Sequence, residues 1–324
     1  MLTKTKNIVQ YIEGLIENKV LSKNDQIPSF TEIMKEHRVS RDTVVRAYKK
    51  LNNRGIIKAV QGKGYFVTNE IIDYEKNLFL LLDELSHYKN TLVKSIERNL
   101  KNSGQYRIFF HHYDSEIFHN LIEQNLGQFT HYAISPFPNS LQVKNTIEQI
   151  PKDRLILLDR HDGQDPNLKF VGQEFLQDIT VCLDKLDNRV EKYTRFIFIF
   201  PELPYYPSEL KIGFKEYCMK MGVECLIVPK VSCISMRHHD AYLVINDSHL
   251  AGIVEKSKLK GWKLGSDIGV ISYNETPLKS VVAEGITTIS TDFKKMGKHL
   301  VSMIFDSKIT NIHNTSDLIL RNSF

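Results

Sequence analysis

Residues 29–67 read SFTEIMKEHRVSRDTVVRAYKKLNNRGIIKAVQGKGYFV, and their pattern predicts the fold of the N-terminal part of the chain. Ser29, followed three residues later by Glu32, forms a capping box and predicts that a helix begins here. After a short turn, a second helix is expected from Ser40, because its apolar residues recur at the i, i+3, i+4, i+7 spacing of one buried face. Gly55 is expected to end that helix in left-handed backbone geometry.

The basic side chains of the second helix lie on the faces that this apolar stripe leaves outside. Two short strands are expected at residues 56–60 and 65–67, with a glycine-rich tip between them that could approach phosphates closely. A helix fits the major groove of B-form DNA, where arginine bonds guanine in bidentate fashion and neighbouring polar groups position the phosphates. The candidate DNA-binding residues are therefore Ser29, Arg41, Asp42, Thr43, Arg46, Lys50, Gly62 and Lys63.

Charge is unevenly distributed along the 324 residues. Residues 1–69 hold nine lysines and four arginines against six acidic residues, a net charge of +7, so the remainder holds −2 of the total +5. A small basic segment on a slightly acidic body indicates a polyanionic partner for the segment alone. An amphipathic helix over residues 8–16 completes this segment, and a charged linker is expected at residues 70–76.

From residue 77 onward, apolar strands alternate with helical segments, which predicts βαβ units and parallel sheets. After Asn77, residues 78–82 are continuously apolar, as expected of a strand buried on both faces. About eleven strands are too many for one comfortable open sheet, so we expect two lobes. Ligands of such sheets bind at the carboxyl ends of the strands.

Polar residues directly after these strands are candidates to line a cleft between the lobes. Carboxylates and amides suit a polyhydroxylated ligand, because each can accept from or donate to a hydroxyl in a fixed direction. The same residues could instead be polar only because strand ends meet water, and both interpretations stay open for any single residue. The candidate effector-binding residues from this pattern are Asp83, His111, Ser135, Arg160, Glu174, Asn246, Asp247 and Asn274.

Several other classes of protein are disfavoured by the sequence. The longest apolar run, residues 78–82, is far shorter than a membrane span, and the N-terminal residues lack the pattern of a signal peptide, so a cytoplasmic protein is expected. The four cysteines lack CxxC spacing and are expected to be free, buried thiols. The histidine pairs at 111–112 and 238–239 lack the spacing of zinc ligands. No GxSxG, Walker or Rossmann glycine motif occurs, so we expect no metal, no cofactor and no enzyme activity.

Residues 1–69 resemble the winged helix-turn-helix of the GntR family of bacterial regulators. The segments IPS, VSRDTV, GII and GKGYFV carry the resemblance. It implies DNA contacts from Arg41, Thr43, Arg46 and the wing residues Gly62 and Lys63. Thr31 stands where the family usually has arginine, which implies that one contact is lost or replaced.

Residues 77–324 resemble the effector domain of LacI-type regulators, which is itself similar to periplasmic sugar-binding proteins. The segments LILLDR, AYLVIND and SDIGVISYNETPL carry this resemblance, which is stronger in the second half. Leu210 stands where the family often has an arginine, so one charged anchor for a sugar is missing. The resemblance implies effector contacts from Arg160, Asn246, Asp247 and Asn274, and from His87 and Tyr88 after the first strand.

The expected fold is an α/β two-lobed, periplasmic-binding-protein-like (type I) domain at residues 77–324, preceded by a small α+β winged helix-turn-helix domain at residues 1–69. The expected function is a sequence-specific transcription regulator, a repressor that binds double-stranded operator DNA as a homodimer, because one head covers only half a site. A monosaccharide or sugar phosphate between the lobes would control operator affinity. A likeness to sugar regulators of gut Bacteroidetes makes L-fucose a candidate. Two alternatives stay open: a sugar-processing enzyme with a nucleic-acid-binding appendage, and a solute-binding protein for transport.

Overall fold

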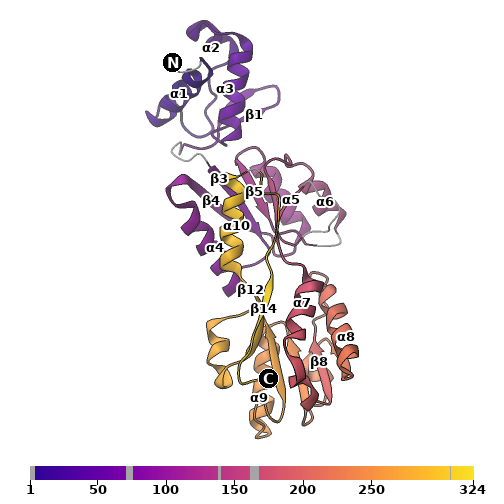
Figure 1. The fold of residues 1–324 in the computed structure, drawn as a ribbon. Coiled ribbons are helices and arrows are strands. Elements are labelled where there is room, and N and C mark those ends of the chain that lie inside the picture. Colours follow the sequence, from indigo (N-terminus) through magenta and orange to yellow (C-terminus); the bar gives the residue numbers. More distant parts are fainter. Residues whose placement is uncertain (1–3, 71–75, 138–139, 161–167, 307) are drawn as a thin grey trace.

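The computed structural model of the chain describes residues 4–70, 76–137, 140–160, 168–306 and 308–324. Most of the expected linker, residues 71–75, lies outside the described residues. Three bodies follow one another along the molecule: a small head at the N-terminal end, an α/β lobe beside it, and a second α/β lobe farthest from the head (Figure 1). We call the two lobes the N-lobe and the C-lobe.

The head, residues 4–70, contains three helices and a two-stranded antiparallel hairpin. Its hydrophobic core is made of head residues alone, so it does not depend on the lobes for burial. The elements are α1 (Lys4–Glu17), α2 (Phe30–His37), α3 (Arg41–Asn53), β1 (Ile57–Val60) and β2 (Gly64–Val67).

The predicted start and stop signals of the head helices are largely confirmed. The Ser29 hydroxyl accepts from the backbone N–H of Glu32 at 3.3 Å, and the Glu32 carboxylate accepts from the Ser29 N–H at 2.6 Å. Gly55 follows α3 with φ of 68°, as expected. Ser40 occupies the N-cap position of α3, but its hydroxyl bonds the Thr43 hydroxyl at 2.9 Å instead of capping the backbone.

The N-lobe is built on a six-stranded, all-parallel sheet in the order β13-β7-β6-β5-β3-β4. Helices α4 (His87–Leu100) and α10 (Phe293–Phe305) cover one face, and α5 (Ser115–Asn125) and α6 (Leu141–Ile147) cover the other. The strands are β3 (Lys76–Leu82), β4 (Gly104–Phe110), β5 (His131–Ile134), β6 (Leu155–Asp159), β7 (Lys169–Gly172) and β13 (Asn311–His313).

The C-lobe repeats this plan, with the order β14-β12-β11-β10-β8-β9 and an antiparallel edge strand, β14. Helices α7 (Phe175–Asp184) and α8 (Glu209–Met221) cover one face, and α9 (Asp247–Leu259) covers the other. The strands are β8 (Arg195–Ile199), β9 (Glu224–Val228), β10 (Asp240–Val244), β11 (Gly269–Tyr273), β12 (Thr287–Thr291) and β14 (Ser316–Ile319). The C-lobe also contains the short 3-10 helices η2 (Asp187–Lys192), η3 (Val231–Cys233), η4 (Pro277–Ser280) and η5 (Val282–Glu284), whereas η1 (Lys101–Ser103) lies in the N-lobe.

The chain passes between the lobes after β7, after β12, and between β13 and β14. The Thr291 hydroxyl donates to Gln173 Oε1 at 2.5 Å and bonds Ser316 Oγ at 2.7 Å, so the three passages are joined by side chains. Two parallel-sheet lobes joined in this way confirm the predicted two-lobed α/β fold. Within the described residues, no helix is both long and apolar enough to cross a membrane.

Candidate functional site

Helix α3 presents a basic face on the outside of the head. Its apolar residues are buried in the head core, which leaves the opposite side of the helix to solvent. Lys49, which the sequence analysis did not name, is exposed there as well. The predicted DNA-binding residues of α3 comprise the exposed Arg41, Asp42, Arg46 and Lys50 and the half-buried Thr43.

The wing is the hairpin β1–β2, and Gly62 and Lys63 are exposed at its tip. The Gln26 side chain donates to the Lys63 carbonyl oxygen at 2.8 Å, and the Ile27 N–H donates to the Tyr65 carbonyl oxygen at 2.9 Å. The segment before α2 therefore pairs with the hairpin alongside β2, which no sequence pattern indicated. These bonds fix the wing relative to α2 and hence to α3.

A cavity of about 240 Å³ lies between the two lobes. Its wall comes from the carboxyl ends of strands in both sheets, where parallel α/β sheets bind ligands. It also contains two lysines and several aromatic side chains that the sequence analysis did not name: Lys89, Tyr113, Phe175, Tyr205, Tyr206, Lys279 and Phe293. The predicted effector residues that line it are Asp83, His87, Tyr88, Ser135, Arg160, Asn246, Asp247 and Asn274.

A buried lysine anchors the N-lobe side of the cavity. The Nζ of Lys89 lies 2.5 Å from Asp83 Oδ1 and 3.6 Å from Asp159 Oδ2, and Asp83 also accepts from the Tyr113 hydroxyl at 2.9 Å. Burial alone would raise the pKa of Asp83, but the Lys89 charge and these hydrogen bonds hold it below its usual value. Burial would likewise lower the pKa of Lys89, and the two carboxylates raise it instead. Both side chains are therefore charged at neutral pH.

The C-lobe side of the cavity is held by a second buried lysine. The Nζ of Lys279 donates to the carbonyl oxygens of Tyr273 and Asn274 at 2.9 and 2.7 Å, and lies 3.0 Å from Asp247 Oδ1. Burial lowers the pKa of Lys279, and the Asp247 charge opposes that shift. Each buried lysine of the cleft is thus paired with an aspartate of the same lobe.

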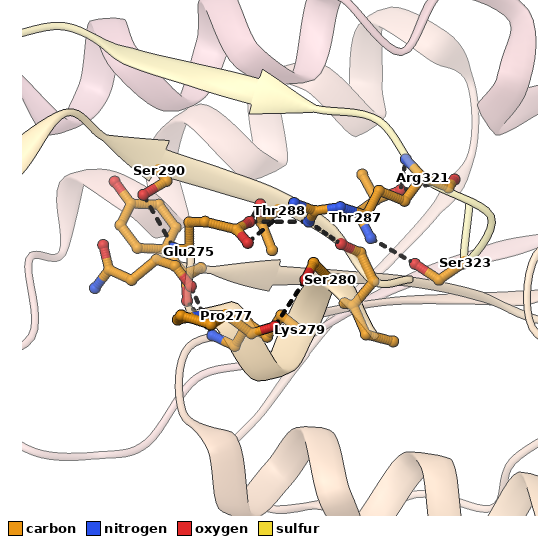
Figure 2. Close-up of polar contacts among 12 residues, drawn as sticks. Glu275, Pro277, Lys279, Ser280, Thr287, Thr288, Ser290, Arg321 and Ser323 are labelled. Atoms are coloured by element: carbon orange, nitrogen blue, oxygen red, sulfur yellow. Dashed lines mark hydrogen bonds and ion pairs between the residues drawn. The ribbon is translucent and has the colours of Figure 1, made fainter. Parts of the chain in front are cut away.

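Asn274 occupies a fixed loop directly after β11. Its backbone has φ of 61°, and its N–H donates to the Ile289 carbonyl oxygen at 2.7 Å. The next residue, Glu275, accepts two hydrogen bonds from the Arg321 guanidinium at 2.9 and 3.0 Å and a third from the Thr288 hydroxyl (Figure 2). The side-chain oxygen of Asn274 is buried, and no described group donates to it. A buried acceptor of this kind on a cavity wall suits a ligand that carries a hydroxyl donor.

The lobes touch across the cleft. The rings of Tyr113, from the loop after β4, and Tyr205, from the loop after β8, stack with centroids 3.7 Å apart and planes at 11°. Arg160 Nη1 donates to the Tyr205 carbonyl oxygen at 2.8 Å, and its guanidinium lies 5.5 Å from the centre of the Phe175 ring. The structure therefore has the lobes closed on each other.

Two predicted effector residues do not line the cavity. His111 is fully buried: its Nδ1 accepts from the Tyr113 N–H at 3.1 Å, so its Nε2 donates to the Ser135 carbonyl oxygen at 3.0 Å. Burial lowers the pKa of His111 to about 4, which keeps the ring neutral. His111 thus positions two lining residues instead of facing the ligand space. Glu174 is exposed at the N-cap position of α7, and its neighbour Gln173 lines the wall in its place.

The cysteines are free, but they are not all buried as expected. Cys182 and Cys218 lie in the core, Cys225 is half-buried and Cys233 is exposed, because the connection from β9 to β10 crosses the surface. Across the parts of the chain that the structure describes, His, Cys, Asp and Glu side chains do not gather in threes or more as metal ligands would.

Two family models match separate parts of the chain. Residues 4–67 match the model of the bacterial regulatory proteins of the gntR family. Residues 189–323 match the model of the periplasmic binding protein-like domain. A comparison with curated proteins finds no match.

The lobes are also similar to solved structures. A LacI family transcriptional regulator from Silicibacter pomeroyi aligns with a TM-score of 0.64 and 16% identity, over 76% of this chain and 98% of that chain. A dimeric Lac repressor with a C-terminal deletion aligns with a TM-score of 0.63 and 15% identity, over 76% and 98%. The Lac repressor dimer bound to operator and the anti-inducer ONPF aligns with a TM-score of 0.59 and 16% identity, over 76% and 93%. These structures share the fold of the two lobes.

Proposed function

We propose that this chain, a ligand-responsive transcription regulator with a GntR-type DNA-binding domain joined to a LacI-type effector domain, is a repressor that leaves its operator when a monosaccharide binds between the lobes. We assign DNA binding to residues 1–69, effector binding to residues 77–324 and their connection to residues 70–76. The observation that carries the proposal is an exposed basic helix at one end of the N-lobe and a small, polar, closed cleft at the other.

For operator binding, we place α3 in the major groove and the wing on the neighbouring backbone. Arg41 and Arg46 are suited to base edges, and Lys50 and Lys63 are suited to phosphates, because all four are exposed and basic. One head covers half a site, so we propose a homodimer on a palindromic operator. Such a protein acts where the chromosome is, which in a bacterium is the cytoplasm.

The size and lining of the cleft favour one sugar ring. About 240 Å³ is below the roughly 300–1,000 Å³ of pockets that hold drug-sized ligands. The unsatisfied oxygen of Asn274 suits a sugar hydroxyl, and the carboxylates of Asp83 and Asp247 can each accept from another. Tyr88 and Phe293, with ring centroids 4.9 Å apart, supply an apolar surface for the face of the ring.

The charges of the cleft favour an uncharged sugar over a sugar phosphate. Lys89 and Lys279 are already paired with aspartates, and the third cation of the lining, Arg160, donates to the Tyr205 carbonyl oxygen, so a phosphate would have to displace one of these contacts. It would also lie near four carboxylates in the lining, which repel it. L-fucose, an uncharged sugar, is one candidate. The four carboxylates are Asp83, Glu84, Asp159 and Asp247.

The effector can change operator affinity only by binding one arrangement of the lobes better than another. The Tyr113–Tyr205 stack and the Arg160 bond to the Tyr205 carbonyl oxygen join the lobes in the closed arrangement. A ligand enclosed between them adds contacts to both lobes and stabilises closure. In a dimer, closure would change the spacing of the two heads and release the operator.

A melting-temperature screen tests the ligand class. We expect one monosaccharide from a panel that includes L-fucose to raise Tm by several degrees at 100 times its Kd, which adds about 2.7 kcal/mol. Its phosphate ester should give no shift, and the same sugar should release the protein from operator DNA. Asp247→Asn frees Lys279 of its carboxylate and should improve binding of the phosphate ester. A screen in which only phosphorylated sugars act would overturn the uncharged-ligand assignment.

A sugar-processing enzyme is the alternative that the same cleft permits. Incubation of the purified protein with the sugar that shifts Tm separates the two functions. Full recovery of the unchanged sugar supports the regulator, and turnover supports the enzyme. Salt-dependent binding of one duplex sequence by the same preparation argues against a solute-binding protein for transport.

A further inference from the structure

Three neighbouring strands of the N-lobe sheet carry polar residues at both ends. At their carboxyl ends, β3, β5 and β6 lead into Asp83, Ser135 and Arg160 of the cleft. At their amino ends lies a second polar cluster, which we call the joint surface. It consists of Asn77, residues 128–130 and Arg154.

The C-terminal end of α3 rests on the joint surface. Arg154 Nη2 donates to the side-chain oxygen of Asn53, and Arg154 Nη1 donates to the Phe129 carbonyl oxygen at 3.4 Å. Gly55 comes so close that a Cβ added to it would lie 1.9 Å from the Gln128 carbonyl oxygen. Only glycine leaves room for this approach, and the φ of 68° at Gly55 also favours glycine.

The head side of this contact is held firmly. The Thr68 hydroxyl donates to the Gly55 carbonyl oxygen at 2.7 Å, and the Thr68 N–H donates to the Ile56 carbonyl oxygen at 2.8 Å. Arg54, the residue between Asn53 and Gly55, pairs with Glu13 of α1. The end of α3 and the exit of the chain from the head therefore move as one piece.

The lobe side is equally ordered. Asn77 and Thr130 share three hydrogen bonds: the Asn77 N–H donates to Thr130 Oγ1 at 2.8 Å, and the Thr130 N–H and hydroxyl each donate to the Asn77 carbonyl oxygen at 2.9 Å. Asn77 Nδ2 also donates to the Gln128 carbonyl oxygen at 3.3 Å, and the Tyr132 N–H donates to the Arg154 carbonyl oxygen at 2.8 Å. The joint surface is thus continuous with the strands that reach the cleft.

We infer that the joint surface, and not the covalent linker alone, fixes the recognition helix on the N-lobe and carries the effector signal to it. This rests on the proposed function. A flexible tether would absorb a rotation of the N-lobe, whereas a head seated on the sheet follows it. At roughly 3.3 Å per residue, the seven residues of β3 span about 23 Å, so one rigid element connects cleft and joint.

Two single substitutions on opposite sides of the contact test the inference in the full chain. Arg154→Ala and Asn53→Ala should each leave effector affinity within twofold, because neither residue lines the cleft. The ratio of operator affinities without and with effector, typically about 5- to 150-fold for coupled sites, should fall at least threefold. The double variant should lose no more than either single variant, since both remove one contact. Arg98→Ala, at an exposed arginine of α4 in the same lobe, is the matched control and should change nothing.

A second readout needs no effector. Cleavage at Glu70, the last described residue of the head, by a glutamate-specific protease should be at least threefold faster in Arg154→Ala and Asn53→Ala, and unchanged in Arg98→Ala, because an unseated head leaves this residue more accessible. Equal cleavage rates in all four proteins would overturn the seat. A normal affinity ratio in both joint variants would overturn its role in signalling. A wild-type protein whose operator affinity changes with no sugar would instead refute the proposed function. The cleavage rates would still show whether the head is held on the joint surface.

Discussion

The head and the cleft carry their positive charges in opposite ways. On α3, Arg41, Arg46 and Lys50 are exposed, and no described carboxylate pairs with them. In the cleft, the side chains of Lys89 and Lys279 are 2% and 4% exposed, and each is paired with an aspartate. Exposed cations gain by neutralising phosphates and releasing counterions, whereas buried cations must be compensated within the protein.

The same residue types can therefore serve two unlike ligands within one chain. The positive charges of α3 are not compensated by described carboxylates of the head, which suits a polyanionic partner. In the cleft, the buried lysines are compensated by aspartates, and the lining offers hydrogen-bonding groups such as the buried Asn274 oxygen, to which no described group donates. Substitutions in the cleft should therefore change the stability of the protein, and substitutions in the head should change its affinity for DNA.

The largest effect is expected from Lys89→Met. Removal of the buried cation leaves the half-buried carboxylates of Asp83 and Asp159 close together without a cation between them, which should cost about 3 kcal/mol of unfolding free energy and lower Tm on the order of 10 °C. Thermal unfolding of the full chain measures the loss. The double variant Lys89→Met, Asp83→Asn should regain part of it. An unchanged Tm would show that Lys89 contributes no more to stability than an exposed lysine of the head.

The second-largest effect is expected from acid, which should lower the unfolding free energy of the two lobes. The pKa of His111 is lowered to about 4 from the usual 6.5, so the unfolded chain takes up a proton in this interval that the folded chain refuses. The stability is fully present above pH 6.5 and is lost as pH falls toward 4, by about 3 kcal/mol at most. His131, with its pKa lowered to about 3 by burial, acts with the same sign.

Urea unfolding at pH 7, 5.5 and 4.5 measures this loss, and His111→Asn should flatten the pH dependence without abolishing it. The contribution of Asp83 is separable, because its lowered pKa gives stability that is present above the ordinary carboxylate pKa and is lost only at lower pH. An equal pH slope in wild type and His111→Asn would contradict the assignment of His111 as a buried neutral group.

In the head, Arg46→Ala should reduce operator affinity by about 1–3 kcal/mol and relax sequence preference at one position, with Tm unchanged. The reason is that Arg46 is exposed and contributes to binding, not to the core. Fluorescence titration with operator and scrambled duplexes measures both effects. Lys6→Ala, at an exposed lysine of α1, is the control. Full operator affinity in Arg46→Ala would show that α3 does not read the DNA.

The smallest effect is expected at the wing. Lys63→Ala should weaken binding to all sequences about equally and reduce the slope of log affinity against log salt by about 1, as for the loss of one phosphate contact. Titrations at several salt concentrations measure the slope. A change in sequence preference instead of slope would place Lys63 at a base.

The sequence predicted the head more completely than the cleft. The basic face of α3 follows from local spacing, and the strand-end rule located Asp83 and Asn274 at the cavity. The rule could not find Lys89, because a lysine on an amphipathic helix is usually exposed, and its burial depends on a tertiary contact with the distant Asp159 as well as on the nearby Asp83. It placed His111 at the cavity wrongly, since a position after a strand does not fix the direction of the side chain.

The three passages between the lobes also determine the order in which the chain can fold during synthesis. The head is complete once residue 70 has emerged from the ribosome, because its core uses no later residue. The N-lobe, by contrast, lacks α10, which packs on α4, and β13 until residue 313. Domains fold as units from the N-terminus during translation, so a nascent or prematurely terminated chain would already hold a folded head but would have no effector cleft to control it.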